Sequence, residues 1–162
     1  MSIYFSDREI LEIAIGIEKN GYTFYDTLTH SAGGVSARNI YGMLASREIE
    51  HMMTFKKMLK GITDVPSEEP YSSEEYALYL KDLVDSTVFT NEQVAHEKAK
   101  KVKNDLEAIN IALGAEKDSI LFYYAIQDIV SPRDRKALDL IIEEERSHVR
   151  QLSDLRKSLG NI

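Results

Sequence analysis

Two Glu-x-x-His sequences, one in each half of the chain, carry the side chains best suited to chemistry. Glu48 and His51 form the first pair, and Glu145 and His148 form the second. Residues three apart lie on one face of a helix, so each pair can direct a carboxylate and an imidazole toward the same point. Carboxylates and imidazoles that project inward from facing helices are the ligands of two-metal carboxylate sites. The two pairs therefore predict metal binding inside a helical bundle.

Each Glu-x-x-His pair is preceded by a single glutamate in a matching sequence context. Glu18 lies in the sequence GIEK, and Glu116 lies in GAEK. Residues 11–28 align without gaps to residues 109–126, which places the two glutamates at equivalent positions. The segments that carry the Glu-x-x-His pairs share little else, as expected when packing residues drift and metal ligands do not. This repeat predicts two helical hairpins in one bundle, because a solenoid needs at least about three repeats.

Helical periodicity dominates the chain, and four long helices are expected to position these side chains. A capping box that begins at Ser6 predicts the start of the first helix, and Ser131 followed by a proline predicts the start of the fourth. Asn104 is the predicted N-cap of the third, while Ser72 and Thr90 are predicted to cap two short helices before it. The long helices are predicted over residues 7–30, 35–61, 104–130 and 132–160, with a proline-containing loop over 62–71.

The lengths of the predicted connections indicate how the helices are arranged. Short turns make the two helices of each hairpin antiparallel neighbours, whereas the connection over 62–103 is long enough to cross the bundle. One long crossover distinguishes ferritin-like bundles from simple up-and-down bundles. We therefore predict an all-α fold, a ferritin-like antiparallel four-helix bundle with a long crossover between its second and third helices. Hairpins 7–61 and 104–159 and the crossover 62–103 would make residues 1–162 a single domain.

Each of the four long helices has a carboxylate in the middle of its apolar face. An unpaired buried carboxylate is costly, and no lysine or arginine interrupts these apolar faces to neutralise it. Two divalent metal ions would balance four such carboxylates. The predicted metal ligands are Glu18, Glu48, His51, Glu116, Glu145 and His148. In the alternative interpretation, the acidic run 143–145 is a solvated helix face.

Two tyrosines share the helix faces of the single glutamates. Tyr25 lies two turns after Glu18, and Tyr123 lies two turns after Glu116. Each tyrosine could simply fill the core with its hydroxyl group satisfied elsewhere. In the sharper interpretation, each hydroxyl group donates a hydrogen bond to a ligand carboxylate and so orients it.

The composition bounds the classes of partner and the compartment. The chain has 162 residues and a net charge of −7, which disfavours nucleic acid and anionic membranes as partners. It contains no cysteine, so it has no disulfide and no cysteine-ligated metal site. The first residues lack the pattern of a signal peptide, and no apolar stretch reaches the length of a membrane span. A cytoplasmic protein is expected.

Residues 112–124, with the sequence ALGAEKDSILFYY, resemble the diiron domains of rubrerythrins. The resemblance extends over essentially the whole chain and includes the spacing of all six predicted ligands. It implies two iron ions as cofactors, with manganese or zinc as substitutes. It also implies that Glu48 and Glu145 bridge the two metals, that Glu18 and Glu116 are terminal ligands, and that His51 and His148 each bind one metal.

Two departures from the rubrerythrin pattern bear on function. Full rubrerythrins carry a rubredoxin domain with four cysteines, so this cysteine-free chain would need a separate, rubredoxin-like electron donor or a small-molecule reductant. Ser119 stands where rubrerythrins tend to carry an additional carboxylate on the third helix. Because that carboxylate takes part in the ligand exchange of the family, its replacement bears directly on peroxidase activity.

The resemblance implies a non-haem diiron oxidoreductase that reduces hydrogen peroxide in oxidative-stress defence. One alternative is a ferroxidase or iron-handling protein, which would oxidise iron(II) with oxygen or peroxide. The other alternative is a helical binding module in which the metal is structural. Rubrerythrin-like chains are commonly dimeric, so we expect a homodimer, and the long connection would allow its hairpins to be swapped between subunits.

Overall fold

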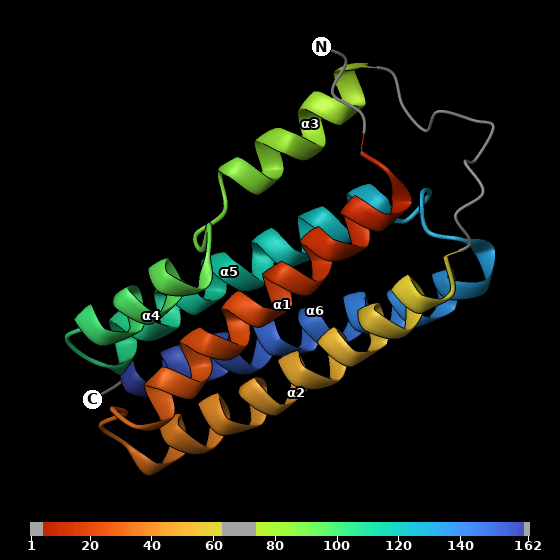
Figure 1. Cartoon of the computed structure of the whole chain (residues 1–162). Helices are drawn as coiled ribbons and strands as arrows, with labels where there is room; N and C mark the ends of the chain where they lie inside the picture. Colours follow the sequence, from red (N-terminus) through yellow and green to blue (C-terminus); the bar gives the residue numbers. More distant parts are fainter. Residues whose placement is uncertain (1–4, 63–73, 161–162) are drawn as a thin grey trace.

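The computed structural model describes residues 5–62 and 74–160. Within these ranges the chain forms six helices and no strand (Figure 1). This confirms the predicted all-α fold. The helices are α1 (Asp7–Thr29), α2 (Val35–Lys60), α3 (Glu74–Asp85), α4 (Glu92–Lys101), α5 (Asp105–Ile126) and α6 (Pro132–Gly160).

Four of the helices form the bundle, and two cover one side of it. The most extensive packing is between α1 and α2 and between α5 and α6, which are the two predicted hairpins. The hairpins meet where α1 contacts α5 and where α2 contacts α6. In Figure 1, α1 and α5 run in opposite directions. Helix α4 packs along α1 and helix α3 leans against α5, so the crossover lies outside the four-helix core.

The starts of α1, α4 and α5 have side-chain caps, one of which corrects the prediction. Ser6 forms the predicted capping box with Glu9. The Asn104 side chain accepts a hydrogen bond from the backbone of Glu107, which confirms it as the cap of α5. The prediction for α4 was wrong, because Asn91 rather than Thr90 accepts from the first turn. An amide oxygen placed one residue later reaches the free N–H groups of that turn.

The predicted third helix ends earlier than its apolar pattern indicated. Helix α5 ends at Ile126, and Ile126 then accepts hydrogen bonds from the backbone N–H groups of both Ile129 and Val130. This tight turn buries Ile129 and Val130 against the core, so their apolar character does not continue the helix. The predicted loop, apart from Ile62, and the predicted cap Ser72 lie outside the described residues.

The core consists of two apolar clusters, one toward each end of the bundle. One is built around Phe24 and Leu44 and the other around Phe55 and Leu138. Each of these four side chains is fully buried, and leaving water stabilises the fold by about 1.5–3 kcal/mol for a side chain of this kind. The clusters hold the four helices at fixed spacing on both sides of a central polar layer.

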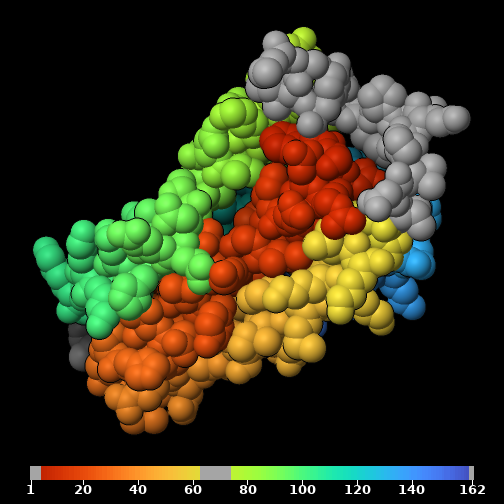
Figure 2. Space-filling model, in the orientation of Figure 1, coloured from red at the N-terminus to blue at the C-terminus, as the bar shows by residue number. Residues whose placement is uncertain are grey.

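One face of the molecule shows how the crossover helices sit on the bundle. Figure 2 shows a hollow between α3 and α1, at the bottom of which part of α5 is visible. Helix α3 buries Ala77 and Leu80 but leaves Leu78 and Tyr79 substantially exposed. None of the described helices combines the length and apolarity needed to cross a bilayer.

Candidate metal centre

The six predicted ligands converge in the middle of the bundle. Every one of them is at most 5% exposed. Tyrosines aside, they are the only buried polar or charged side chains in residues 5–62 and 74–160. Each of the four long helices contributes one carboxylate, and α2 and α6 each add a histidine. The residues are Glu18 from α1, Glu48 and His51 from α2, Glu116 from α5, and Glu145 and His148 from α6.

The cluster divides into two overlapping groups of potential ligand atoms. Within each group, one atom from every residue lies within 4.8 Å of the others. Glu48 and Glu145 belong to both groups, whereas each histidine belongs to only one. Two adjacent metal positions that share two carboxylates would fit this arrangement. The groups are Glu18, Glu48, His51 and Glu145, and Glu48, Glu116, Glu145 and His148.

Glu145 connects the two halves of the cluster directly. Its Oε1 atom lies 2.9 Å from Nδ1 of His51, and its Oε2 atom lies 3.1 Å from Nδ1 of His148. The two imidazole rings stack with their centroids 5.8 Å apart and their planes at 24°. The second carboxylate near each Nδ1 is a single glutamate, Glu18 at 3.3 Å from His51 and Glu116 at 3.5 Å from His148. Nδ1 is therefore the atom that each histidine presents to the centre.

The close packing of carboxylates controls how the cluster binds protons without metal. Burial, reinforced by the charge of Glu18, raises the pKa of Glu48 well above its usual range. Burial and the charge of Glu145 raise the pKa of Glu116 to about 8. The pKa of Glu145 is instead lowered, because hydrogen bonds outweigh its burial. Protons are thus retained on some carboxylates at neutral pH because like charges this close cannot all ionise.

The same carboxylates raise the pKa of both histidines, against the effect of burial. Burial alone would lower the pKa of His51, but hydrogen bonds to Glu145 and Glu18 raise it to about 11. Burial likewise opposes the charge on His148, and hydrogen bonds to Glu116 and Glu145 raise its pKa to about 9. Protons therefore occupy the positions around Nδ1 where metal cations would provide positive charge.

The two predicted tyrosines reach across the bundle. Tyr25 of α1 donates a hydrogen bond to Glu116 of α5, and Tyr123 of α5 donates one to Glu18 of α1. Both rings are at most 2% exposed. Burial, with the charges of nearby carboxylates, raises the pKa of both phenols well above the usual range, so both remain donors. Each tyrosine hydroxyl group thus donates to a carboxylate of the cluster, as one of the two interpretations of the sequence predicted. Each of these hydrogen bonds joins one hairpin to the other.

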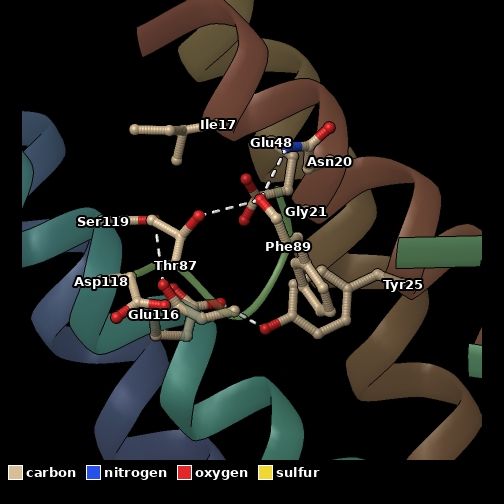
Figure 3. Close-up of a pocket in the computed structure, with 11 residues that line it drawn as sticks. Ile17, Asn20, Gly21, Tyr25, Glu48, Thr87, Phe89, Glu116, Asp118 and Ser119 are labelled. Atoms are coloured by element: carbon tan, nitrogen blue, oxygen red, sulfur yellow. Dashed lines mark hydrogen bonds between the residues drawn. The ribbon is translucent and has the colours of Figure 1, made fainter. Parts of the chain in front are cut away.

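A cavity beside the cluster lies between α1 and α5. It has a volume of about 20 Å³, enough for a molecule the size of water. Glu48 and Glu116 form part of its wall, together with Gly21 and Ser119 (Figure 3). Gly21 and Ser119 occupy equivalent positions of the internal repeat, one turn after Glu18 and Glu116. The cavity exists because both of these positions carry small residues.

The segment that joins α3 to α4, residues 86–91, contributes Thr87 and Phe89 to the wall of this cavity. The backbone N–H of Val88 donates to Asp118 of α5 over 2.8 Å, and Asn20 of α1 donates to the carbonyl oxygen of Phe89 over 3.1 Å. The Phe89 ring also packs against Phe24, with 4.7 Å between ring centroids. The segment is therefore fixed to both helices that border the cavity, as Figure 3 shows for Asn20 and Phe89.

Two residues that contribute to the site were not identified from the sequence. An added Cβ at Gly21 would lie 2.7 Å from Oε2 of Glu48, so Gly21 allows that carboxylate to approach α1 closely. Glu144 accepts a hydrogen bond from Nε2 of His51 over 2.9 Å. Comparing the two halves of the repeat would have marked Glu144, because the equivalent residue is Arg47.

The chemistry of the donors fits a pair of divalent metal ions. Carboxylate oxygens and neutral imidazoles are suitable ligands for iron, manganese and zinc. The four carboxylates match the charge of two divalent cations, and the described part of the chain places no lysine or arginine among the buried side chains. Nδ1 of each histidine and the shared carboxylates face the same space, so the residues present could hold the metals that the fold implies.

Comparisons with known proteins agree with this geometry. No curated protein and no solved structure matches the chain. The family model described as Rubrerythrin matches residues 9–156, a range that begins in α1, ends in α6 and includes all six residues of the cluster. The chain therefore belongs to the rubrerythrin family, whose members are diiron proteins.

Proposed function

We propose that this protein binds two iron ions in the central cluster and reduces hydrogen peroxide. The observation that carries the proposal is that Glu48 and Glu145 belong to both groups of potential ligand atoms. Shared carboxylates hold two metal ions close enough to act on one small molecule. Hydrogen peroxide takes up two electrons and two protons to give two molecules of water. The bound iron pair would supply both electrons, each iron passing from iron(II) to iron(III).

The side chains around the cluster would hold the metals and control access. Glu18 and Glu116 each serve one half of the site, and their tyrosine partners keep them oriented. The cavity between α1 and α5 leads to Glu48 and Glu116, and its volume of about 20 Å³ suits a molecule of a few atoms. Asn20 and Asp118 anchor the segment over this cavity, which limits access by bulk water.

Iron(II) oxidation with subsequent iron transfer or storage is the second candidate function. Ser119 favours it, because the position of the additional rubrerythrin carboxylate is occupied by a hydroxyl group. This hydroxyl group donates to the carbonyl oxygen of Ala115 over 3.2 Å and so is directed to its own helix. A site without that carboxylate has one ligand fewer to exchange when the iron changes its oxidation state. In this case iron would be the substrate, with oxygen or peroxide as the oxidant.

Anaerobic loading with iron(II), followed by stopped-flow absorbance, tests the proposal. The loaded protein is mixed with stoichiometric hydrogen peroxide and, separately, with oxygen. Two irons per chain that peroxide oxidises much faster than oxygen does would support peroxide reduction. Oxidation by oxygen that continues beyond two irons per chain would instead support the iron-handling function. Tight metal binding without any redox reaction would indicate a helical module with a structural metal.

We also propose that the peroxidase cycle uses a separate electron donor. The chain contains no cysteine, so it lacks the ligands for a rubredoxin-type iron site of its own. Adding a rubredoxin to the oxidised protein should restore iron(II) at a rate that depends on the donor concentration.

We further propose a homodimer, which would cover exposed apolar side chains such as Met53 on α2. Sedimentation analysis would test this, and the cytoplasmic location stays a prediction.

A further inference from the structure

We propose that Glu144 is a positioning residue for His51 and that it makes the two metal positions unequal. His51 places Nε2 2.9 Å from Oε2 of Glu144 while its Nδ1 faces the centre of the cluster. The inference rests on the proposed two-metal site. The position served by His51 should bind its metal more tightly than the position served by His148.

The hydrogen bond to Glu144 determines which nitrogen of His51 is available. An ionised carboxylate only accepts hydrogen bonds, so Nε2 must carry the proton. Nδ1 of the neutral ring then presents its lone pair to the metal. A carboxylate at the far nitrogen also fixes the plane of the ring and makes the imidazole a more basic ligand. The ring of His51 is only 3% exposed, and Glu144 accepts the hydrogen bond of its Nε2.

The half of the cluster that contains His148 lacks an equivalent carboxylate. The internal repeat that matches Glu48 with Glu145 and His51 with His148 also matches Arg47 with Glu144. A guanidinium group only donates hydrogen bonds and so does not accept one from a protonated Nε2. Arg47 pairs instead with Glu50 on its own helix, over 2.6 Å.

His148 has no counterpart of Glu144 in the part of the chain that the structure describes. Its hydrogen bond and ion pairs there are all made by Nδ1, with Glu145 and Glu116. Nε2 therefore lacks a protein acceptor among residues 5–62 and 74–160. The two histidines are thus related by a nearly two-fold arrangement, but only His51 has a carboxylate that accepts from its Nε2.

Titration of the metal-free protein with cobalt(II) tests the inference without any turnover. Calorimetry gives the affinity of each binding step, and the cobalt absorbance reports the coordination of each ion. We expect two binding steps of different affinity for the natural sequence. Glu144→Ala should weaken the tighter step by about 10- to 100-fold, the usual effect of losing such a partner, and leave the weaker step unchanged. Glu144→Gln should retain most of the affinity, because its amide oxygen still accepts from Nε2.

Three further variants separate hydrogen bonding from charge. Glu143→Gln removes the neighbouring exposed carboxylate and should leave both steps unchanged. Arg47→Glu places an acceptor at the equivalent position beside His148 and should strengthen the weaker step, whereas Arg47→Ala should not. In the zinc-loaded protein, the Nε2 proton of His51 should give a slowly exchanging NMR signal that is lost in Glu144→Ala.

Four results would overturn the inference. Glu144→Ala could bind both ions as tightly as the natural protein, which would show that the contact is an ordinary surface ion pair. It could weaken both steps equally, or Glu143→Gln could weaken them as much, and either result would indicate a general charge effect. If the natural protein bound no metal at all, the proposed site itself would be wrong, and this inference would fail with it.

Discussion

Tyr123 of α5 donates a hydrogen bond to Glu18 of α1, across the boundary between the two hairpins. The reciprocal bond runs from Tyr25 of α1 to Glu116 of α5. Each hairpin therefore supplies a donor to a carboxylate of the other. The antiparallel arrangement of α1 and α5 makes this exchange geometrically possible, because each tyrosine lies two turns after the glutamate of its own helix.

Replacing Tyr123 with phenylalanine should weaken both the fold and metal binding. The change leaves a buried oxygen of Glu18 without its donor, which costs about 1–3 kcal/mol of unfolding free energy. Glu18 would also lose the contact that orients it, so affinity for a divalent metal should fall by about tenfold or more. Denaturant unfolding of the metal-free protein and calorimetric titration with zinc measure the two effects. Tyr124→Phe is the control, since Tyr124 is 47% exposed. Equal behaviour of the two variants would show that the hydroxyl group of Tyr123 has no orienting role.

Two glycines of α1 provide a matched pair for testing the approach of Glu48. Gly16 has open space around an added Cβ, so Gly16→Ala should stabilise the helix by about 0.5–1 kcal/mol. Gly21→Ala brings the same gain in helix propensity, but its Cβ would lie 2.7 Å from Oε2 of Glu48 and displace that carboxylate. We expect Gly21→Ala to fold normally and to bind metal about tenfold or more weakly, because ligand geometry tolerates only small shifts. Circular dichroism and zinc titration of both variants would decide this, and full affinity in Gly21→Ala would argue against a ligand role for Glu48.

Glu145→Ala should eliminate both metal positions together. Its two oxygens face different histidines, so no other single substitution in α6 removes a contact from each half of the cluster. The expected result is a fall in bound iron from two ions per chain to almost none, measured by metal analysis after anaerobic loading and desalting. Glu143→Gln is the control for charge on the same helix. Retention of one firmly bound ion in Glu145→Ala would show that Glu145 is not shared between the two positions.

The metal-free protein should lose stability as the pH rises from about 6 to 9. Burial and neighbouring carboxylates raise the pKa of Glu116 to about 8, and hydrogen bonds raise that of His148 to about 9. A group with a raised pKa binds its proton more tightly in the folded state, so its contribution is complete at low pH and disappears as pH passes the folded value. Thermal unfolding at about pH 6 and pH 9 measures the change, and Glu116→Gln should show a smaller one. Zinc affinity should rise over the same interval, because bound metal displaces these protons. A melting temperature that increased from pH 6 to 9 without metal would contradict this description of the cluster.

The ligand cluster could be predicted because it depends on residue type and on helical spacing. A carboxylate in the middle of an apolar face, such as Glu18, has few structural explanations, and the repeat supplied a second example in Glu116. The long helices were predictable for the same reason, since their apolar faces persist over many turns. The end of α5 was less predictable, because Ile129 and Val130 continue the apolar pattern while packing in a turn.

The contacts that Glu144 and Gly21 make with other helices could not be derived from periodicity. Glu144 belongs to an acidic run that favours a solvated face, and it is in fact 46% exposed. Its contact with His51 depends on how α6 is rotated against α2, which no local pattern specifies. Gly21 has no side chain that could suggest a role in the site. Its role, leaving space for the carboxylate of Glu48, depends on where Glu48 lies in the folded protein. The sequence therefore indicates which side chains form the cluster, whereas the neighbours that support them require the packed structure.

The segment that lines the cavity, between α3 and α4, has no equivalent in the internal repeat. Residues 86–91 belong to the crossover, which passes along α1 and α5 and leaves the opposite side of the core, between α2 and α6, to charged surface residues such as Arg47 and Glu144. The crossover thereby makes the two sides of an internally repeated core different. Changes of sequence in the crossover can alter the wall of this cavity while the six side chains of the cluster stay in place. Reactivity and metal binding are thus open to separate evolutionary adjustment in this fold.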